Sequence, residues 1–431
     1  MKALTVILAA AMTLIAAAPA QAGNWAMFHH DVLHGGGTTE TAVNSTSAAT
    51  LTQIWAFAAG SAVYSSPAIV KNTATGRTVA YVGTNGGNVD AIDTATGTLL
   101  WSYPTGKRVD SSPAVVGNRV YVGSENDSLY VLNATTGVKI CSYQTTGRIE
   151  ASPVVANPGG GNVVYVGDEG LTGGDDGGGM WAINATTCAL KWHYASFGAP
   201  PGSKPTAGVW SPAAFAKTAS GTPLVVFGSS SPEGAVYALN ATTGARVWRF
   251  QTQQFAADED VGAGPTISPP GSLFASGAVF VSGKDNMVYG LNLANGHKLW
   301  QFSIRTDEPS SFATGEPRST AALVGGKLYV GWGEGLYCLN PLTGAKIWNT
   351  AVVNGPTAEL ISSPAVSGAS GHRVVIDGDV NGTLYAWNAQ TGKLVKSIAQ
   401  GTSILGSTAI SYGAVYVPDA NGNLYAYKPA T

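Results

Sequence analysis

The sequence has 431 residues, of which 45% are hydrophobic and only 11% are Asp, Glu, Lys or Arg. A chain this rich in apolar residues can bury a sizeable core, which excludes an intrinsically disordered protein. The formal net charge of -2 leaves no basic excess to neutralise a phosphate backbone or an anionic bilayer, so we expect neither nucleic acid nor a membrane surface as a partner. The 56 Gly and 22 Pro residues favour many short strands joined by turns.

Residues 1–22 have the pattern of an export signal. Lys2 gives a positive start, residues 6–18 form an apolar run, and residues 20–22 form a small-x-small site, so we expect cleavage after Ala22. A membrane anchor is the alternative, but the apolar run is shorter than the about 20 residues that a spanning helix needs. We therefore predict a secreted or periplasmic protein without a membrane span.

One pattern recurs along the rest of the chain: an apolar triplet, Asn or Asp, a short polar stretch, Gly, three residues and Trp. The four closest copies are VDAIDTATGTLLW (89–101), VYALNATTGARVW (236–248), VYGLNLANGHKLW (288–300) and LYCLNPLTGAKIW (336–348). Three variants begin at residues 129, 180 and 384, and a partial copy, LYAYKPAT, stands at the C-terminus. This regularity indicates one structural unit repeated along the chain.

Two further strand-like segments precede each copy. The first is similar to YSSPAIV (64–70) or ISSPAVS (361–367), and the second to VYVGS (120–124). Each is an alternating or apolar run bounded by Gly, Asn or Pro, which is typical of strands. The Asn-to-Gly core of the repeat has the residues of a tight turn between the third and fourth strands. One repeat is thus predicted to be a four-stranded antiparallel unit.

Such units bury both faces when they stack radially, which predicts an all-β fold, the β-propeller. The turn glycines at 244, 296, 344 and 392 are 52, 48 and 48 residues apart. About 409 residues after the signal then divide into eight units of about 51, so we predict a single eight-bladed propeller over residues 51–431. The last unit has only three strands, and we expect LTQIWAFAAG (51–60), with Trp55 in the outer-strand position, to close the ring.

These repeats resemble the tryptophan-docking motif of the pyrroloquinoline quinone (PQQ) propellers. This eight-bladed family includes quinoprotein alcohol dehydrogenases, polyvinyl alcohol dehydrogenases and the outer-membrane assembly factor BamB, and the resemblance covers essentially all of the chain after the signal. It implies that the Trp of one blade stacks on the turn Gly of a neighbouring blade. The residues in this role would be Trp101, Trp192, Trp248, Trp300 and Trp348.

The two least regular copies are neighbours in the sequence. Cys141 stands in the Trp position of one, and Cys188 stands in the Gly position of the next. Because these two positions touch in the family geometry, the resemblance implies a Cys141–Cys188 disulfide in place of the stacked pair; two independent substitutions are the alternative. Cys338 takes a small apolar position and is expected to be a buried free thiol. With three cysteines and no CxxCH motif, a covalently attached haem is excluded.

In the dehydrogenases of this family, the quinone lies on the propeller axis against a Trp, and Ca²⁺ is held by a Glu and an Asn. By match with the polyvinyl alcohol dehydrogenase branch, VYVGDEG (164–170) implies Glu169 as a calcium ligand, and GVWSPAAF (208–215) implies Trp210 as the stacking residue. The alternatives are a solvated acidic loop, which also contains Asp175 and Asp176, and a Trp of the core.

The same family uses an Asp as base and a Lys or Arg on the quinone oxygens. DEDVGAGPT (258–266) implies Asp260 as the base, and VSGKDNMVYGLN (281–292) implies Lys284 as the cation; a loop charge and a turn lysine are the alternatives. Residues 229–231 are all Ser where the family has Thr-Gly-Asn. The Asn ligand is therefore missing, and Ser231 is left as its possible replacement. The family's disulfide between adjacent cysteines is also absent.

Residues 23–50 form a lead-in segment before the first repeat. It contains NWAMFHHDVLHGG (24–36), whose three His and one Asp could ligate a transition metal. The segment also resembles the lead-in of many secreted PQQ-like propellers, which implies that it packs on the outside of the propeller. We favour this packing role over a metal site.

The resemblance implies a PQQ- and Ca²⁺-dependent dehydrogenase. Asp260 would take the hydroxyl proton of a small or polymeric alcohol, and an external acceptor would take the electrons. A non-catalytic scaffold that binds a protein or polysaccharide is the alternative, because this fold does not determine function. The two hypotheses differ in whether Glu169, Trp210, Asp260 and Lys284 converge on the propeller axis.

Overall fold

The computed structural model describes residues 23–170, 178–195, 208–231, 233–253, 260–307, 319–333, 335–352 and 359–430. The export signal expected over residues 1–22 lies outside these ranges, and so do Asp175 and Asp176 of the Gly-rich loop. No described helix is long and apolar enough to cross a membrane.

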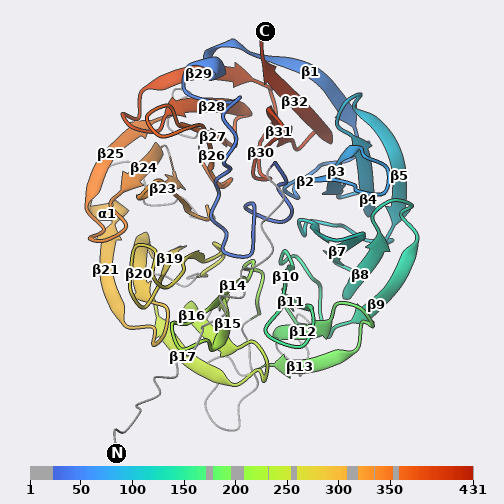
Figure 1. Ribbon diagram of the computed structural model, residues 1–431, viewed down its shortest axis with the longest axis vertical. Coiled ribbons are helices and arrows are strands. Elements are labelled where there is room, and N and C mark those ends of the chain that lie inside the picture. Colours follow the sequence, from blue (N-terminus) through green and yellow to red (C-terminus); the bar gives the residue numbers. More distant parts are fainter. Residues whose placement is uncertain are drawn as a thin grey trace, which may run out of the picture.

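The described residues form eight four-stranded antiparallel sheets, which are arranged as blades in a ring (Figure 1). Blades 1 to 3 contain β2 (Ala68–Lys71), β3 (Thr78–Gly83), β4 (Asn88–Asp93) and β5 (Thr98–Pro104), then β6 (Ala114–Val116), β7 (Arg119–Ser124), β8 (Ser128–Asn133) and β9 (Lys139–Gln144), then β10 (Val154–Ala156), β11 (Val163–Gly167), β12 (Met180–Asn184) and β13 (Leu190–Tyr194). Blades 4 to 6 contain β14 (Ala214–Lys217), β15 (Pro223–Gly228), β16 (Ala235–Asn240) and β17 (Arg246–Gln251), then β18 (Thr266–Ser268), β19 (Ala278–Gly283), β20 (Met287–Asn292) and β21 (Lys298–Ser303), then β22 (Ala322–Val324), β23 (Lys327–Trp332), β24 (Gly335–Leu339) and β25 (Lys346–Ala351). Blade 7 contains β26 (Ala365–Ser367), β27 (Val374–Gly378), β28 (Thr383–Asn388) and β29 (Leu394–Ala399).

The ring closes as the sequence predicts. Blade 8 consists of β30 (Ala409–Ser411), β31 (Ala414–Pro418), β32 (Asn423–Pro429) and, as its outer strand, β1 (Leu51–Ala58). β1 pairs antiparallel with β32 from Leu51 opposite Pro429 to Ala58 opposite Asn423, so the two ends of the repeat region share one sheet. Two short helices, η1 (Ser47–Thr50) and α1 (Ile304–Asp307), are the only ones among the described residues.

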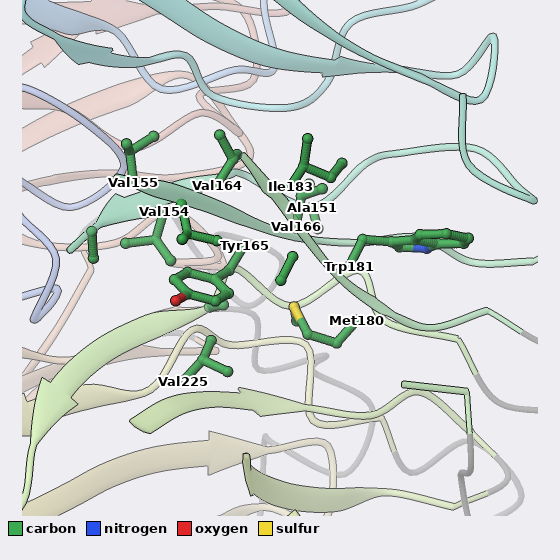
Figure 2. Close-up of a cluster of buried hydrophobic side chains, with 14 of the residues drawn as sticks. Ala151, Val154, Val155, Val164, Tyr165, Val166, Met180, Trp181, Ile183 and Val225 are labelled. Carbon is green, nitrogen blue, oxygen red and sulfur yellow. The ribbon is translucent and has the colours of Figure 1, made fainter. Parts of the chain in front are cut away.

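The middle strands of each blade are covered by neighbouring blades on both faces. β19 is buried at every residue, whereas the outer strand β17 alternates between exposed and covered residues. Because the second strand of each blade is buried on both faces, its sequence is a continuous apolar run rather than an alternating one. In blade 3, Val154, Tyr165 and Met180 pack towards Val225 of blade 4 (Figure 2), so the core consists of the spaces between the blades.

The predicted turn and the tryptophan ring are both confirmed. In blade 4, the Asn240 side chain accepts hydrogen bonds from the N–H groups of Thr242 and Thr243, and Gly244 has a φ of +76°, a conformation that favours glycine. Each docking Trp lies against the turn Gly of the next blade: Trp55 on Gly97, Trp101 on Gly137, Trp192 on Gly244, Trp248 on Gly296, Trp300 on Gly344 and Trp348 on Gly392. A Cβ at any of these glycines would overlap the indole.

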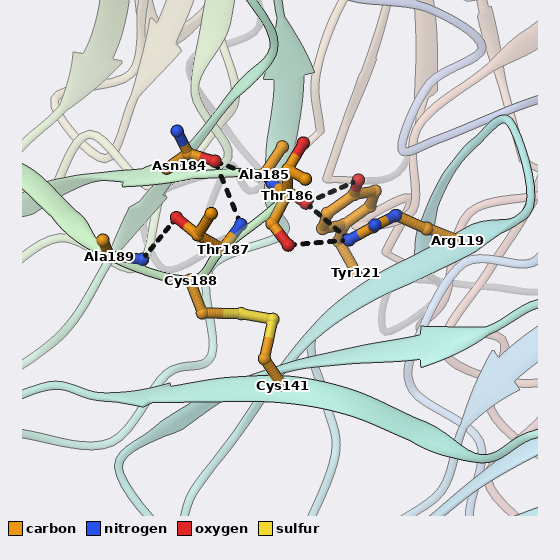
Figure 3. The surroundings of a disulfide bond; sticks show 9 residues. All are labelled: Arg119, Tyr121, Cys141, Asn184, Ala185, Thr186, Thr187, Cys188 and Ala189. Atoms are coloured by element: carbon orange, nitrogen blue, oxygen red, sulfur yellow. Dashed lines mark hydrogen bonds between the residues drawn. A yellow bond between two sulfur atoms is a disulfide. The ribbon is translucent and has the colours of Figure 1, made fainter.

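Between blades 2 and 3 the Trp–Gly contact is missing, and the expected disulfide stands in its place. Cys141 in β9 and Cys188 in the turn after β12 are bonded, with Cα atoms 6.1 Å apart (Figure 3). Cys188 has a φ of +57°, so it keeps the left-handed conformation of the glycine that it replaces. The prediction for Cys338 is also confirmed: it is a buried free thiol, and burial raises its pKa to about 12.

The expected position of the lead-in segment is wrong. Residues 24–40 do not lie on the outside of the propeller but bond to its innermost strands. The Ile69 and Val115 N–H groups in blades 1 and 2 donate to Trp25 and Ala26, and the Val366 N–H in blade 7 donates to Gly36. The physical reason is that the inner strands are short and leave backbone groups free at their inner edge, which this segment satisfies.

Candidate functional site: the axial cavity

A cavity of about 310 Å³ lies at the centre of the ring. In seven of the eight blades one residue lines it from the same sequence position, immediately before the Ser-Ser-Pro-like segment that leads into the first strand; in blade 6 this position is residue 318, outside the described residues. In chain order these residues are Tyr64, Asp110, Glu150, Trp210, Gly262, Ile361 and Leu405. Although the backbone repeats, the side chains differ from blade to blade, so this position is where the blades stop being equivalent.

A series of hydrogen bonds joins seven of the blades around the same cavity, two residues further along the chain in each of them. At this position the backbone N–H of one blade donates to the side-chain hydroxyl of the next. The bonds run from Gly264 to Thr320, Ser363, Ser407, Ser66, Ser112 and Ser152, each 2.8 to 3.0 Å long. In blade 4 this position is Pro212, which has neither a hydroxyl nor an N–H. The series therefore stops beside Trp210.

Four of the residues nominated from the sequence come together where this series stops. The Trp210 ring lies so close to Gly262 that a Cβ there would be 1.6 Å from the indole. The Lys284 Nζ is 6.0 Å from the centre of the Trp210 ring and 3.0 Å from Oδ2 of Asp260. The Ser231 N–H donates to the other oxygen of Asp260. Trp210, Asp260, Lys284 and Ser231 thus form one cluster from blades 4 and 5.

The ion pair of Asp260 and Lys284 has counterparts in other blades. Asp260 stands in the loop that enters the first strand of blade 5, and Lys284 in the loop that leaves the second strand. At the same two positions, blade 2 has Arg108 and Glu125, 3.4 Å apart, and blade 3 has Arg148 and Glu169, 2.5 Å apart. The pair therefore recurs in three blades, with its charges reversed in blade 5.

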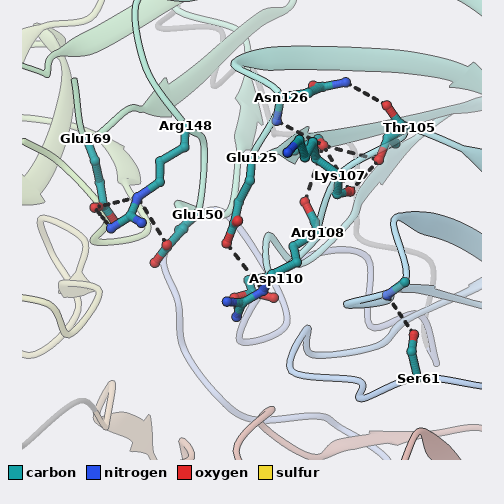
Figure 4. A network of polar contacts seen from close by, with 12 residues as sticks. Ser61, Thr105, Lys107, Arg108, Asp110, Glu125, Asn126, Arg148, Glu150 and Glu169 are labelled. Atoms are coloured by element: carbon teal, nitrogen blue, oxygen red, sulfur yellow. Dashed lines mark hydrogen bonds and ion pairs between the residues drawn. The ribbon is translucent and has the colours of Figure 1, made fainter. Parts of the chain in front are cut away.

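Glu169, the nominated calcium ligand, lies in a second cluster. Its Oε2 accepts hydrogen bonds from both Nε and Nη2 of Arg148 (Figure 4). Oxygen atoms of Asp110, Glu125 and Glu150 lie within 4.8 Å of one another beside it. We refer to Asp110, Glu125, Glu150 and Glu169 as the acidic cluster. Its four carboxyl groups form ion pairs with two arginines, Arg108 and Arg148.

The surroundings raise the pKa of two members of the acidic cluster. Burial raises the pKa of Glu150 to about 7, and the Glu169 carboxylate adds to this shift. Burial also raises the pKa of Asp110 to about 6, although Arg108, 2.6 Å away, opposes the change. Both side chains line the axial cavity, so near neutral pH they can exchange protons with its contents.

The acidic cluster was missed in the sequence, although a signal was present. Arg108 and Asp110 in blade 2, and Arg148 and Glu150 in blade 3, repeat an Arg-x-acid pattern at the same position of two successive blades. In a chain with so few charged residues, such a repeat indicates charges that face each other. The Ser-Ser-Pro segments were interpreted only as strand starts, which left the residue in front of them without a role.

A family model described as "Outer membrane protein assembly factor BamB" matches residues 39–225 and 206–431, nearly all of the described chain. The chain therefore belongs to this family. No curated protein sequence matches it.

Solved structures share the fold at low sequence identity. Quinohemoprotein alcohol dehydrogenase from Comamonas testosteroni is 17% identical with a TM-score of 0.73, over 95% of this chain and 82% of that one. A europium-containing methanol dehydrogenase is 14% identical with a TM-score of 0.76, over 95% and 98%. BamB from Moraxella catarrhalis is 15% identical with a TM-score of 0.65, over 88% and 99%. The fold is thus shared with both dehydrogenases and an assembly factor.

The residues present fit the quinone better than the metal. Trp210 presents a flat aromatic ring to the cavity, and Arg108 and Lys284 supply positive charge near it, as an aromatic tricarboxylate such as PQQ requires. Calcium needs several oxygen ligands. The carboxylate of Glu169 is already bound to Arg148, and the N–H of Ser231 points to Asp260. The pair expected from the sequence as calcium ligands, Glu169 and Ser231, therefore does not fit this metal.

Proposed function

We propose that the chain is a quinoprotein-type propeller that binds PQQ in its axial cavity and oxidises an alcohol. The observation that carries the proposal is the cluster of Trp210, Asp260 and Lys284 beside the cavity. These three residues were nominated from separate segments for one cofactor, and Lys284 lies 3.0 Å from Asp260 and 6.0 Å from the centre of the Trp210 ring. Such a constellation supports a role at one common ligand.

Each residue around the cavity would have its own role in binding or in the reaction. Trp210 would bind one face of the ring system, while Arg108 and Lys284 would pair with carboxylate groups. Bound PQQ would supply a two-electron acceptor for the alcohol. Asp260 would receive the hydroxyl proton at a carboxylate oxygen, and Lys284 would hold that carboxylate in place. Asp110 and Glu150, whose pKa values are raised to about 6 and about 7, would reduce their repulsion of an anionic ligand by taking up protons.

Calorimetry with PQQ tests this function directly. We expect binding by the unmodified protein and a loss of about 5-fold or more in affinity for Trp210→Ala, because an aromatic contact of this kind contributes about 1 kcal/mol or more. Asp260→Asn should keep PQQ binding but lose dye-linked alcohol oxidation. Asp307→Asn, which removes a distant exposed ion pair with Lys346, is the matched control. No heat of binding at tens of micromolar PQQ would refute the proposal.

A non-catalytic scaffold is the second candidate, and one observation favours it. The ion pair of Asp260 and Lys284 has the same position in its blade as the pair of Arg108 and Glu125, for which no catalytic role was nominated. If such pairs serve only to join two loops, the axial residues need no cofactor, and the protein would act through its surface, as an assembly factor does. Absence of PQQ binding, together with capture of a protein or polysaccharide, would support this alternative.

A further inference from the structure

The lead-in segment runs along the inner edges of the blades and crosses the centre of the ring (Figure 1). We refer to residues 25–40 as the strap. Backbone N–H groups of six blades donate to its carbonyl oxygens: Ile69 to Trp25, Val115 to Ala26, Phe215 to Val32, Ile267 to Leu33, Leu323 to Gly35 and Val366 to Gly36. The Glu40 carboxylate at its end accepts from the N–H groups of Tyr412 and Gly413 in blade 8. The strap therefore joins seven of the eight blades by hydrogen bonds.

One strap residue, Phe28, lines the axial cavity together with Trp210. Its ring is held by two histidines of the strap. The centres of Phe28 and His34 are 5.2 Å apart in an edge-to-face arrangement, and those of Phe28 and His29 are 5.8 Å apart. The position of Phe28, and with it one wall of the cavity, thus depends on how these histidines are held.

Both histidines connect the strap to the blades and are buried. His29 Nε2 is 3.0 Å from the Pro364 carbonyl oxygen in front of blade 7, and its Nδ1 is 2.8 Å from the His34 carbonyl oxygen. His34 Nδ1 is 3.1 Å from the Pro265 carbonyl oxygen in front of blade 5. Only 1% and 2% of the two residues are exposed, so water does not reach the rings while the strap is in place.

We propose that the strap is an acid-sensitive closure of the axial cavity, in which Phe28 closes one side and His29 and His34 couple its release to pH. Release exposes both imidazoles to water, where each can bind a proton. Closure takes both rings out of water, so a charged imidazolium loses its hydration there, and the nearby carbonyl oxygens compensate for this loss only in part. Protonation therefore favours the open state, in which Phe28 leaves the cavity.

Burial of the two rings determines this direction, because it outweighs the carbonyl oxygens and Asp31, which favour the protonated imidazoles. Burial lowers the pKa of His29 to about 4 and that of His34 to about 3, from 6.5 in water. The charged or titratable groups that act on them among the described residues are His30 and Asp31 of the strap and the two rings themselves, whereas blades 5 and 7 contribute carbonyl oxygens. The closed strap is thus favoured above pH 6.5 and is weakened as the pH falls from about 6.5 to 4. Each histidine can change the ratio of open to closed forms by up to about 10-fold per pH unit.

Hydrogen exchange of the strap-facing amides tests the proposal on the unmodified full chain. After correction for intrinsic exchange rates, the protection of Ile69, Val115, Phe215 and Ile267 should fall by up to about 100-fold per pH unit below pH 6.5. Amides inside β16 should change much less. Equal pH dependence of strap-facing and β16 amides would overturn the proposal, since it would indicate global unfolding or no coupling.

A single substitution provides the second measurement. His34→Asn should reduce the pH dependence of the strap-facing amides to about one proton, or about 10-fold per pH unit. His297→Asn, at an exposed turn position, should leave it unchanged. If His34→Asn folds and keeps the full dependence, the histidine coupling is wrong. If it does not fold, the pH profile of the unmodified chain still decides the matter.

Discussion

The outer edge of the propeller and its axis follow opposite rules. At the outer edge, Trp55, Trp101, Trp192, Trp248, Trp300 and Trp348 occupy one position and make one contact, on the turn glycine of the next blade. At the axis, one position shared by the seven blades in which it is described holds a Tyr, an Asp, a Glu, a Trp, a Gly, an Ile and a Leu. Repetition therefore marks the contacts that build the ring, and variation marks the residues that face a ligand.

The two irregular joints of the outer edge refine this comparison. Between blades 2 and 3, a disulfide takes over the contact of the missing Trp. Between blades 7 and 8, Lys396 stands in the Trp position, and no turn joins β32 to β1 because these strands come from opposite ends of the chain. A groove of about 410 Å³, lined by Lys396, Tyr425 and Tyr427 among others, remains there. Where the Trp–Gly contact is missing at the outer edge, the joint is thus either closed by a disulfide or left as a groove.

Removal of the closing strand should have the largest effect on stability. Deletion of residues 51–58 takes away β1 and exposes the whole edge of β32, so we expect loss of the cooperative thermal transition rather than a shift of it. Ile54→Ser, which changes an exposed residue of the same strand, should melt within a few degrees of the parent. Circular dichroism on heating measures both. A cooperative transition near the parental temperature in the deletion variant would mean that the other blades hold the ring closed.

Tryptophan substitutions should separate the outer edge from the axis. Trp300 is 8% exposed, lies on Gly344, and donates to the Pro341 carbonyl oxygen at 2.7 Å. Trp300→Ala should cost about 3–5 kcal/mol of unfolding free energy. Trp210→Ala, at the half-buried axial position, should cost less but weaken PQQ binding. Denaturant unfolding measures the stability of both variants, and calorimetry measures their PQQ binding. The comparison would be contradicted if Trp210→Ala caused the larger loss of stability and Trp300→Ala the larger loss of PQQ binding.

The joint between blades 2 and 3 offers an exchange experiment. Replacing both Cys141 and Cys188 by Ser opens a loop of 47 residues and should cost about 2–4 kcal/mol. The double variant Cys141→Trp/Cys188→Gly restores the residues of the other joints and should recover much of the loss, since Cys188 already has the left-handed backbone of a turn glycine. Thermal melting with and without reductant measures this. A Trp–Gly variant no more stable than the Ser variant would show that this joint is shaped for the disulfide alone.

The sequence predicts the fold almost completely and the site only in part. The strands, the turns and the closure by residues 51–60 follow from matches within one repeat, whereas the pairing of Cys141 with Cys188 depended on the resemblance to the PQQ propellers. The contact of Lys284 with Asp260 was not derivable, because it depends on two loops of one blade approaching each other. The engagement of Glu169 by Arg148 was missed for the same reason. The inner course of the strap depends on free backbone groups, which leave no mark in the side-chain pattern.

A buried acid away from the cavity should give a smaller, pH-dependent effect. Asp377 is fully buried, and burial raises its pKa to about 7 from 3.8. The folded state thus holds a proton that the unfolded state has released, so its contribution to stability is lost as the pH rises from about 4 to 7, by up to about 1.4 kcal/mol per pH unit. Asp377→Asn can still accept from the Gly378 N–H and should flatten the pH profile of unfolding. An unchanged profile would mean that other groups titrate in this range.

The smallest effect on stability should come from a substitution at the rim of the cavity. It tests whether the acidic cluster serves to hold the blades together or to set the proton affinity of the cavity. Arg108, the partner of Glu125, is 45% exposed, so Glu125→Gln should change stability by less than about 1 kcal/mol. The Glu125 charge helps to raise the pKa of Asp110 to about 6, and its removal should lower that pKa measurably in a carboxyl NMR titration. Asp307→Asn is the control. A stable variant with a lowered Asp110 pKa would show that the acidic cluster sets proton affinity at the axis, whereas a large loss of stability with no change of this pKa would place it among the contacts that build the ring.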